Sequence, residues 1–183
     1  MDKLARYARQ LILSEIGEEG QRRLLSSTAV VVGCGALGTH IASGLVRGGV
    51  GHVRLIDRDF VELNNLQRQI LFDERDVAQG LPKAVAAAAK LRQINSQVEI
   101  ESIVTDLNPD NVEDLIEDAD VVLDGTDNFE TRLLVNDACL KRDVPWVYGG
   151  VVATYGMTMT IVPGETPCFR CFLNDLHAPG STP

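Results

Sequence analysis

The sequence predicts an α/β fold in which a doubly wound, mostly parallel sheet follows N-terminal helices. Two observations support this prediction. Short runs of aliphatic and β-branched residues alternate with helical patterns from residue 28 onward, which is the order of repeated strand-helix-strand units. The first run, residues 28–32, also ends directly at a glycine-rich segment, residues 33–38, that opens the next helix. We therefore expect helices on both faces of the sheet and a ligand site at the carboxyl ends of its strands.

Each element is predicted from its apolar spacing and from the signals at its ends. Apolar residues at helical intervals predict an N-terminal arm, residues 1–26, with helices around 4–12 and 18–25. The valine run 28–32 is too continuously apolar for an exposed edge and is expected to be a buried strand. Further strands are expected at 52–57, 98–104, 121–124, 145–149 and 157–162, and helices from the glycine segment to about 47 and at 81–94, 111–117 and 128–142.

The composition indicates one compact domain and argues against two classes of protein. Of the 183 residues, 45% are apolar, which suffices for a single core. The 17 basic residues against 26 acidic ones give a net charge of −9, which disfavours a general nucleic-acid binder. No apolar run approaches the roughly 20 residues that span a bilayer, and the N-terminus lacks a secretory signal. We expect a soluble, cytoplasmic protein that contacts no membrane and has reduced thiols.

The glycine segment predicts a nucleotide site. Gly33, Gly35 and Gly38 form G-x-G-x-x-G directly after a strand, where the first permits a tight turn, the second lets backbone approach a phosphate and the third lets helix pack on strand. Asp57 follows 19 residues later at the end of the next strand, where a carboxylate suits ribose hydroxyls. Together they indicate a Rossmann-like nucleotide fold, although a purely structural glycine turn with a solvated Asp57 is the simpler alternative.

The glycine motif leaves the nucleotide open between NAD and ATP. By itself the motif is typical of NAD, so an NAD(P)-dependent oxidoreductase is one hypothesis. However, no residue set later in the chain suggests a nicotinamide pocket with a substrate acid or base. Arg68 and Lys83 lie near predicted helix ends and suit a triphosphate, whose charge must be held and whose leaving group needs stabilisation. The sequence therefore favours ATP.

Several motifs occur together in one order. They are Arg6-Tyr7-x-Arg9-Gln10, the glycine motif, Asn64-Asn65-Leu66-Gln67-Arg68-Gln69, Gly80-x-Pro82-Lys83, Asp124-x-Thr126-Asp127-Asn128 and Cys168-x-x-Cys171. This series resembles the ThiF/MoeB/HesA family, the prokaryotic relatives of ubiquitin-activating enzymes, over nearly the whole chain. One departure is Ala36, where many relatives have glycine; its backbone N–H is retained, so we expect phosphate contact to be retained.

The resemblance implies an adenylyltransferase. Members of the family adenylylate the C-terminal glycine of a ubiquitin-like sulfur-carrier protein ending in Gly-Gly, for thiamin, molybdopterin or related sulfur transfer. The chain would then be a single ATP-binding adenylation domain, with the arm 1–26, a Rossmann-like core 28–162 and the start of a zinc and crossover region at 163–183. A tRNA-modifying dehydratase of the same family and a non-catalytic nucleotide-binding scaffold are the alternatives.

The resemblance also implies roles for individual residues. Asp57 would bind the ATP ribose, Asn65 and Arg68 would lie near the phosphates, and Lys83 would bind the triphosphate. Asp127 would hold Mg²⁺, and Arg9 would reach from one subunit of a homodimer into the site of the other. The catalytic set is therefore Arg9, Arg68, Lys83 and Asp127, and the further nucleotide-binding candidates are Gly33, Gly35, Ala36, Gly38, Asn64, Gln67 and Asn128.

Physical chemistry supports such a set of cations. An incoming carboxylate is deprotonated at neutral pH and needs no general base, but it is repelled by an anionic α-phosphate. Lys83 lies in a first helical turn, the unfavourable end of the helix dipole for a cation, so an anionic ligand would explain its position. The simpler interpretations are surface ion pairs for Arg9 and Arg68 and an N-cap at Asp127-Asn128, which is compatible with metal binding.

The cysteines predict half of a zinc site. Cys168 and Cys171 have zinc-ligand spacing, but a closed site needs four ligands. Cys34 and Cys139 are poor candidates because they lie in the glycine segment and inside a predicted helix, and His177 is a weak one. In the resembled family a second C-x-x-C follows later, so we expect these 183 residues to be a portion of a longer chain that binds zinc. A redox dithiol is the less favoured alternative.

Overall fold

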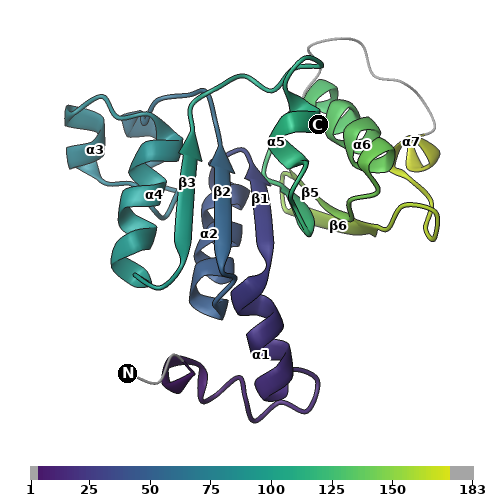
Figure 1. Cartoon of the computed structure of the whole chain (residues 1–183). Coiled ribbons are helices and arrows are strands. Elements are labelled where there is room, and N and C mark those ends of the chain that lie inside the picture. Colours follow the sequence, from purple (N-terminus) through teal and green to yellow (C-terminus); the bar gives the residue numbers. More distant parts are fainter. Residues whose placement is uncertain (1–3, 174–183) are drawn as a thin grey trace.

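The computed structural model describes residues 4–173 and confirms the predicted α/β fold. Six strands form one sheet in the order β3-β2-β1-β4-β5-β6 (Figure 1). The first five strands are parallel, and β6 is antiparallel to β5. The strands are β1 (Thr28–Val32), β2 (His52–Ile56), β3 (Glu99–Ile103), β4 (Val121–Asp124), β5 (Trp146–Val152) and β6 (Tyr155–Ile161).

The helices follow the predicted order, with three short additions. The α-helices are α1 (Gly17–Ser26), α2 (Ala36–Gly48), α3 (Glu74–Ala78), α4 (Lys83–Ile94), α5 (Val112–Ile116), α6 (Phe129–Arg142) and α7 (Phe169–Phe172), and the 3₁₀ helices are η1 (Ala5–Tyr7) and η2 (Leu63–Asn65). The sequence analysis did not predict η2, α3 and α7, although the start of α3 is marked: the Asp73 side chain accepts hydrogen bonds from the backbone N–H groups of Arg75 and Asp76. Within the described residues, no helix is long and apolar enough to cross a membrane.

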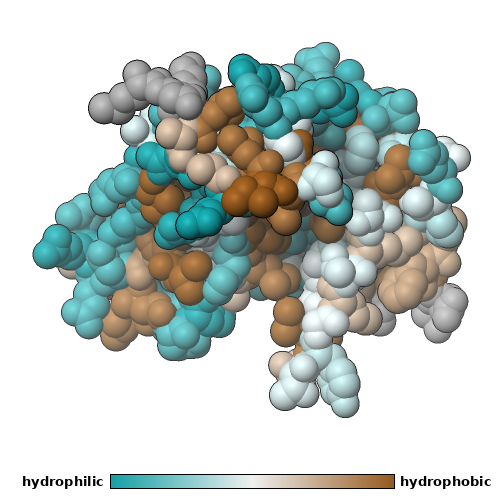
Figure 2. Space-filling model, turned by 90° about the horizontal axis from the view of Figure 1, so that it is seen from below, coloured by the Kyte–Doolittle hydropathy of each residue, from teal (hydrophilic) through white to brown (hydrophobic). Residues whose placement is uncertain are grey.

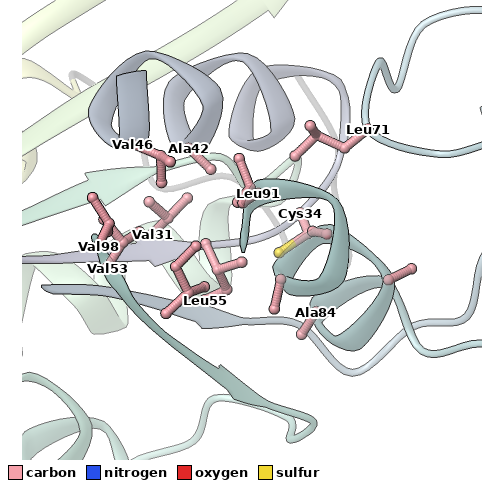
Figure 3. Packing of buried hydrophobic residues seen from close by; sticks show 14 of the residues in the cluster. Val31, Cys34, Ala42, Val46, Val53, Leu55, Leu71, Ala84, Leu91 and Val98 are labelled. Carbon is pink, nitrogen blue, oxygen red and sulfur yellow. The ribbon is translucent and has the colours of Figure 1, made fainter. Parts of the chain in front are cut away.

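The centre of the sheet is buried on both faces, which explains the continuous apolar character of β1. Ala29 and Val31 pack with α2 and α4 on one face, whereas Val30 and Val32 pack with α5 and α6 on the other. Figure 3 shows the first of these clusters, in which Val46 of α2 and Leu91 of α4 lie over the strands. The two layers of helices fix the strand ends rigidly, and these ends carry the site.

The N-terminal arm differs from the prediction of a helix around 4–12. Only Ala5–Tyr7 forms a helical turn, and α1 begins at Gly17. Tyr7 lies beneath the amino edge of the sheet, where its hydroxyl accepts a hydrogen bond of 2.9 Å from Nδ2 of Asn95. Ile12 and Leu13, by contrast, are 72% and 53% exposed. Without burial of its apolar face, a short helix is not stabilised.

Candidate functional site

A cleft of about 990 Å³ opens at the carboxyl edge of the sheet. Its floor comes from the ends of β1, β2 and β4, at Val32, Ile56 and Gly125. The strand order reverses between β1 and β4. From β1 the chain continues to β2 and β3 on one side of the sheet, and it then crosses to β4 on the other side of β1. Crevices at such a switch point are the usual ligand sites of open parallel sheets, as the sequence predicted.

The glycine segment forms one wall of the cleft. Gly33 has a φ of 90°, and a Cβ there would lie 2.8 Å from the carbonyl oxygen of Gly125. A Cβ on Gly38 would lie 1.8 Å from the carbonyl oxygen of Gly33, so neither position accepts a side chain. Gly35 and Ala36 line the cleft at the amino end of α2, whose partial positive charge and free N–H groups favour an anion. Gly38 does not line the cleft but packs beneath the loop.

Asp57 fixes this loop from the side. Its carboxylate accepts hydrogen bonds from the backbone N–H groups of Cys34, at 2.6 Å, and Asp59, at 2.7 Å. Burial raises the pKa of Asp57, and these two hydrogen bonds oppose the rise. The residue lines the cleft, so a carboxylate oxygen with remaining acceptor capacity faces the ligand space. Its contact with a ribose stays a prediction.

Both basic residues that the sequence assigned to a triphosphate, Arg68 and Lys83, line the same cleft. Nζ of Lys83, the first residue of α4, lies 2.9 Å from Oδ2 of Asp59, and its side chain is 11% exposed. The guanidinium of Arg68 is exposed and donates a hydrogen bond of 2.8 Å to the carbonyl oxygen of Asn64. The structure therefore places in one cleft two cations that are separated along the chain.

Only some of the predicted nucleotide-binding residues around η2 line the cleft. Asn65 lines the cleft and is buried, and its Oδ1 accepts a hydrogen bond from the backbone N–H of Glu62. Asn64 and Gln67 do not line the cleft. The carbonyl oxygen of Asn64 accepts hydrogen bonds from the side chains of both Gln67 and Arg68. The positions of Asn64 and Gln67 therefore do not support the prediction that these residues contact the nucleotide directly.

Asp127 and Asn128 line the cleft after β4. Oδ1 of Asn128 accepts a hydrogen bond of 2.9 Å from the backbone N–H of Thr131 and caps α6, as the sequence predicted. In residues 4–173 there is no group of three or more metal-ligating side chains. This donor set suits Mg²⁺ that arrives with a nucleotide, because Mg²⁺ keeps several waters and takes one or two carboxylates together with phosphate oxygens. Asp127 lines this cleft, and its role as the Mg²⁺ ligand stays a prediction.

Sequence reasoning missed Asp59 and Arg132, which also line the cleft. Arg132 is 1% exposed and its Nε lies 3.1 Å from Oδ2 of Asp124. Burial raises the pKa of Asp124, whereas the charge of Arg132 lowers it. A signal was present, because Arg132 stands in the first turns of α6 as Lys83 stands at the start of α4, both unfavourable positions for a cation.

Arg9 does not reach the cleft of its own chain. The side chain of the next residue, Gln10, donates a hydrogen bond of 3.1 Å to the carbonyl oxygen of Gly48, the last residue of α2. The first residue of α2 faces the cleft, and a helix of 13 residues is about 20 Å long. Arg9 therefore lies at the opposite end of the molecule. Figure 2 looks at this end and shows apolar residues exposed on it.

The cysteines separate into two buried thiols and one close pair. Cys34 and Cys139 are buried, as expected of small apolar residues, and burial raises the pKa of Cys139 to about 12. The Sγ atoms of Cys168 and Cys171 are 3.5 Å apart, outside the cleft. Burial raises the pKa of Cys168, but hydrogen bonds from Cys171, the backbone of Arg170 and the side chain of Asn136 together outweigh this and leave the pKa lowered. His177 lies outside the described residues.

We expect the 183-residue chain to hold well under one zinc ion per molecule. The pair Cys168 and Cys171 supplies two thiolates, whereas structural zinc takes four ligands, and no third ligand joins them within residues 4–173. The zinc content of purified protein would be measured by mass spectrometry, with C168S/C171S as the control. A near-stoichiometric zinc content that this double substitution abolishes would contradict the half-site interpretation.

Comparison with known proteins matches the chain to one family. A model described as the ThiF family matches residues 7–183. The chain is 50% identical over 177 residues to the sulfur carrier protein ThiS adenylyltransferase of Bacillus subtilis (strain 168), which covers 97% of this chain and 53% of the relative. It is 42% identical over 181 residues to the SAMP-activating enzyme E1 of Haloferax volcanii, covering 99% of this chain and 66% of the relative.

A solved structure shares the fold. The crystal structure of E. coli MccB with ATP superimposes with a TM-score of 0.80 and 32% identity, covering 91% of this chain and 52% of that one. The chain therefore spans about half the length of MccB and of the Bacillus subtilis relative.

Proposed function

Because the chain belongs to the ThiF family, we propose that it adenylylates the C-terminal glycine of a ubiquitin-like sulfur-carrier protein, using ATP. The names of the Bacillus subtilis and Haloferax volcanii relatives support a carrier-activating role, and the ATP complex of MccB supports ATP as the nucleotide. The observation that carries the proposal is the convergence on one cleft of the amino end of α2, Arg68, Lys83 and Asp127, which come from four separate segments.

These groups suit adenylate formation. A carboxylate oxygen of the carrier tail would attack the α-phosphorus of ATP; the new O–P bond forms while the bond to the bridging oxygen breaks, and pyrophosphate leaves with its electron pair. The attacking carboxylate is already deprotonated, so the chain supplies no general base. When bound with the nucleotide, Mg²⁺ neutralises phosphate charge.

The protein's own contribution is positioning and charge. Arg68 and Lys83 offset the repulsion between the carboxylate and the phosphates, and the N–H groups at the start of α2 orient the phosphate chain. Asp127, which lines the same cleft, would hold the metal ion. Asp57 holds the glycine loop through the N–H of Cys34, which keeps the phosphate wall in place before ATP arrives.

The proposal is tested by exchange of labelled pyrophosphate into ATP. We expect exchange only when a carrier ending in Gly-Gly is present, and none when the last glycine is removed, because the attacking carboxylate is then misplaced by one residue. The same protein is titrated with NAD while the fluorescence of its single tryptophan, Trp146, is followed. If no exchange occurs with or without the carrier and NAD binding is saturable, the oxidoreductase hypothesis is favoured instead.

We also propose that the active form is a homodimer. Arg9 lies at the end of the molecule opposite the cleft, so it can act at a site only in a second copy. Near Arg9, Ile12 and Leu13 are exposed large apolar side chains, of the kind that an interface covers. The dimer therefore accounts both for the position of Arg9 and for an apolar surface on the arm.

A further inference from the structure

Arg132, which is among the residues lining the cleft, occupies the centre of a buried network. Its Nε lies 3.1 Å from Oδ2 of Asp124, and its Nη2 donates hydrogen bonds to the carbonyl oxygens of Thr126, at 2.7 Å, and Gly149, at 3.2 Å. The guanidinium carbon lies 5.1 Å from the ring centre of Tyr148. One side chain thus joins the carboxyl end of β4, the loop after it and β5.

The same network holds the loop 125–127 from its other side. Oδ1 of Asp124 accepts hydrogen bonds from both the backbone N–H of Thr126, at 2.8 Å, and its hydroxyl, at 2.7 Å. Gly125 lies against the glycine loop, because a Cβ there would be 2.6 Å from the carbonyl oxygen of Gly33. The loop is therefore fixed relative to the phosphate wall of the cleft, and it ends at Asp127.

Stability alone is a poor explanation of this network. Asp124 and Arg132 are both 1% exposed, and the cost of desolvating two charges largely cancels their attraction. In addition, Nη1 of Arg132 is buried and has no hydrogen-bond partner among the described residues. An apolar pair of similar volume would fill the space at lower cost, so the network is better explained by the geometry that it imposes on the loop.

We propose that Arg132 is a positioning residue that holds the segment 125–127 against the glycine loop, so that Asp127 is directed towards the metal ion of a bound nucleotide. The inference rests on the proposed function for the role of Asp127. Arg132 itself touches no reacting atom, since its nitrogen atoms are engaged with Asp124, Thr126 and Gly149 or covered. Groups that orient a metal ligand in this way change metal affinity or activity by about 10- to 100-fold when they are replaced.

The test is R132K, which keeps the charge but cannot bridge Asp124, Thr126 and Gly149 at once. Calorimetry measures ATP affinity with and without Mg²⁺, and pyrophosphate exchange gives kcat and KM. We expect the Mg²⁺ concentration for half-maximal ATP binding to rise about 10-fold and kcat to fall about 10- to 100-fold. ATP affinity without metal and KM for the carrier should change little. The amide of Thr126 should also exchange faster with solvent.

Matched variants separate positioning from folding. Arg54 is the control, because it too is a largely buried arginine with two acidic partners, Glu101 and Asp118, but it does not line the cleft. R54K should leave Mg²⁺ dependence unchanged. If R132K does not fold, T126V, which removes only the hydroxyl bond to Asp124, should shift Mg²⁺ dependence in the same direction by a smaller factor.

An unchanged Mg²⁺ dependence in folded R132K, or in T126V where R132K is unfolded, overturns the inference. So does a shift of equal size in R54K. Failure of the proposed function has a different signature: the unsubstituted chain would bind Mg²⁺ and ATP without carrier-dependent exchange. In that case the calorimetric comparison still decides the role of Arg132.

Discussion

Replacing Lys83 with alanine is expected to slow carrier-dependent pyrophosphate exchange by about 10²- to 10³-fold, the cost of removing one group that stabilises developing charge. Lys83 is the first residue of α4, its side chain is 11% exposed, and it lines the cleft. At the amino end of a helix a cation is disfavoured unless an anion is near, and Asp59 at 2.9 Å supplies one until a triphosphate enters. The predicted loss therefore appears mainly in kcat.

Lys90 provides a matched control on the same helix. Its ammonium also pairs with carboxylates, those of Asp73 and Asp76, but it does not line the cleft. K90A should retain exchange within about 2-fold, because exposed ion pairs contribute little. Both variants should unfold in urea with a stability loss of about 1 kcal/mol or less, since the ion pairs that they remove, one in K83A and two in K90A, are partly exposed. Equal exchange rates in K83A and K90A would contradict the role given to Lys83.

Most of the fold follows from local pattern. The run 28–32 reads as a doubly buried strand because its successive side chains enter two different clusters, and the structure confirms this burial. The glycine segment is predictable for the same reason: a φ of 90° at Gly33 and the close approach of Gly38 to Gly33 are local requirements that other residues cannot meet. Such features need no knowledge of distant partners.

The N-terminal arm shows where local pattern fails. Residues 4–12 have helical spacing, but the conformation is decided by Tyr7 packing against Gly49, where a Cβ would lie 2.5 Å from the tyrosine ring, and by its bond to Asn95. The hydrogen bond joins residues 88 positions apart. No periodicity within the arm contains that information, so the tertiary contact overrides helix propensity.

In the site, too, some residues can be predicted from local pattern, whereas others depend on tertiary contacts. Lys83 could be predicted because its position at a helix start is electrostatically unfavourable without a ligand, and the same reasoning applied to α6 would have found Arg132. Asp59 could not, because its importance depends on meeting the ammonium of Lys83 across 24 positions. The position of Asn64 and Gln67 outside the cleft likewise follows from the turn of η2, which directs the carbonyl oxygen of Asn64 to hold Arg68.

A heterodimer of one R9A chain and one K83A chain is expected to be active, although each variant alone should be nearly inactive. Arg9 cannot reach the cleft of its own chain, since Gln10 beside it is bound to the far end of α2. In a symmetric heterodimer, the K83A chain donates Arg9 to the cleft of the R9A chain, which still has Lys83. One of the two sites is then complete, so isolated heterodimers should show about half of the unsubstituted rate.

Co-expression with two different affinity tags isolates the heterodimer, and pyrophosphate exchange measures its activity. Arg6 is the matched control on the same arm, because its Nη1 donates a hydrogen bond of 3.0 Å to the carbonyl oxygen of Ile94 within its own chain. R6A should therefore remain active alone. If Arg9 acted within its own chain, the heterodimer would contain no complete site, since one chain lacks Arg9 and the other lacks Lys83. Exchange no faster than in either parent would thus exclude a site shared between two copies, whereas recovery of half the rate requires one.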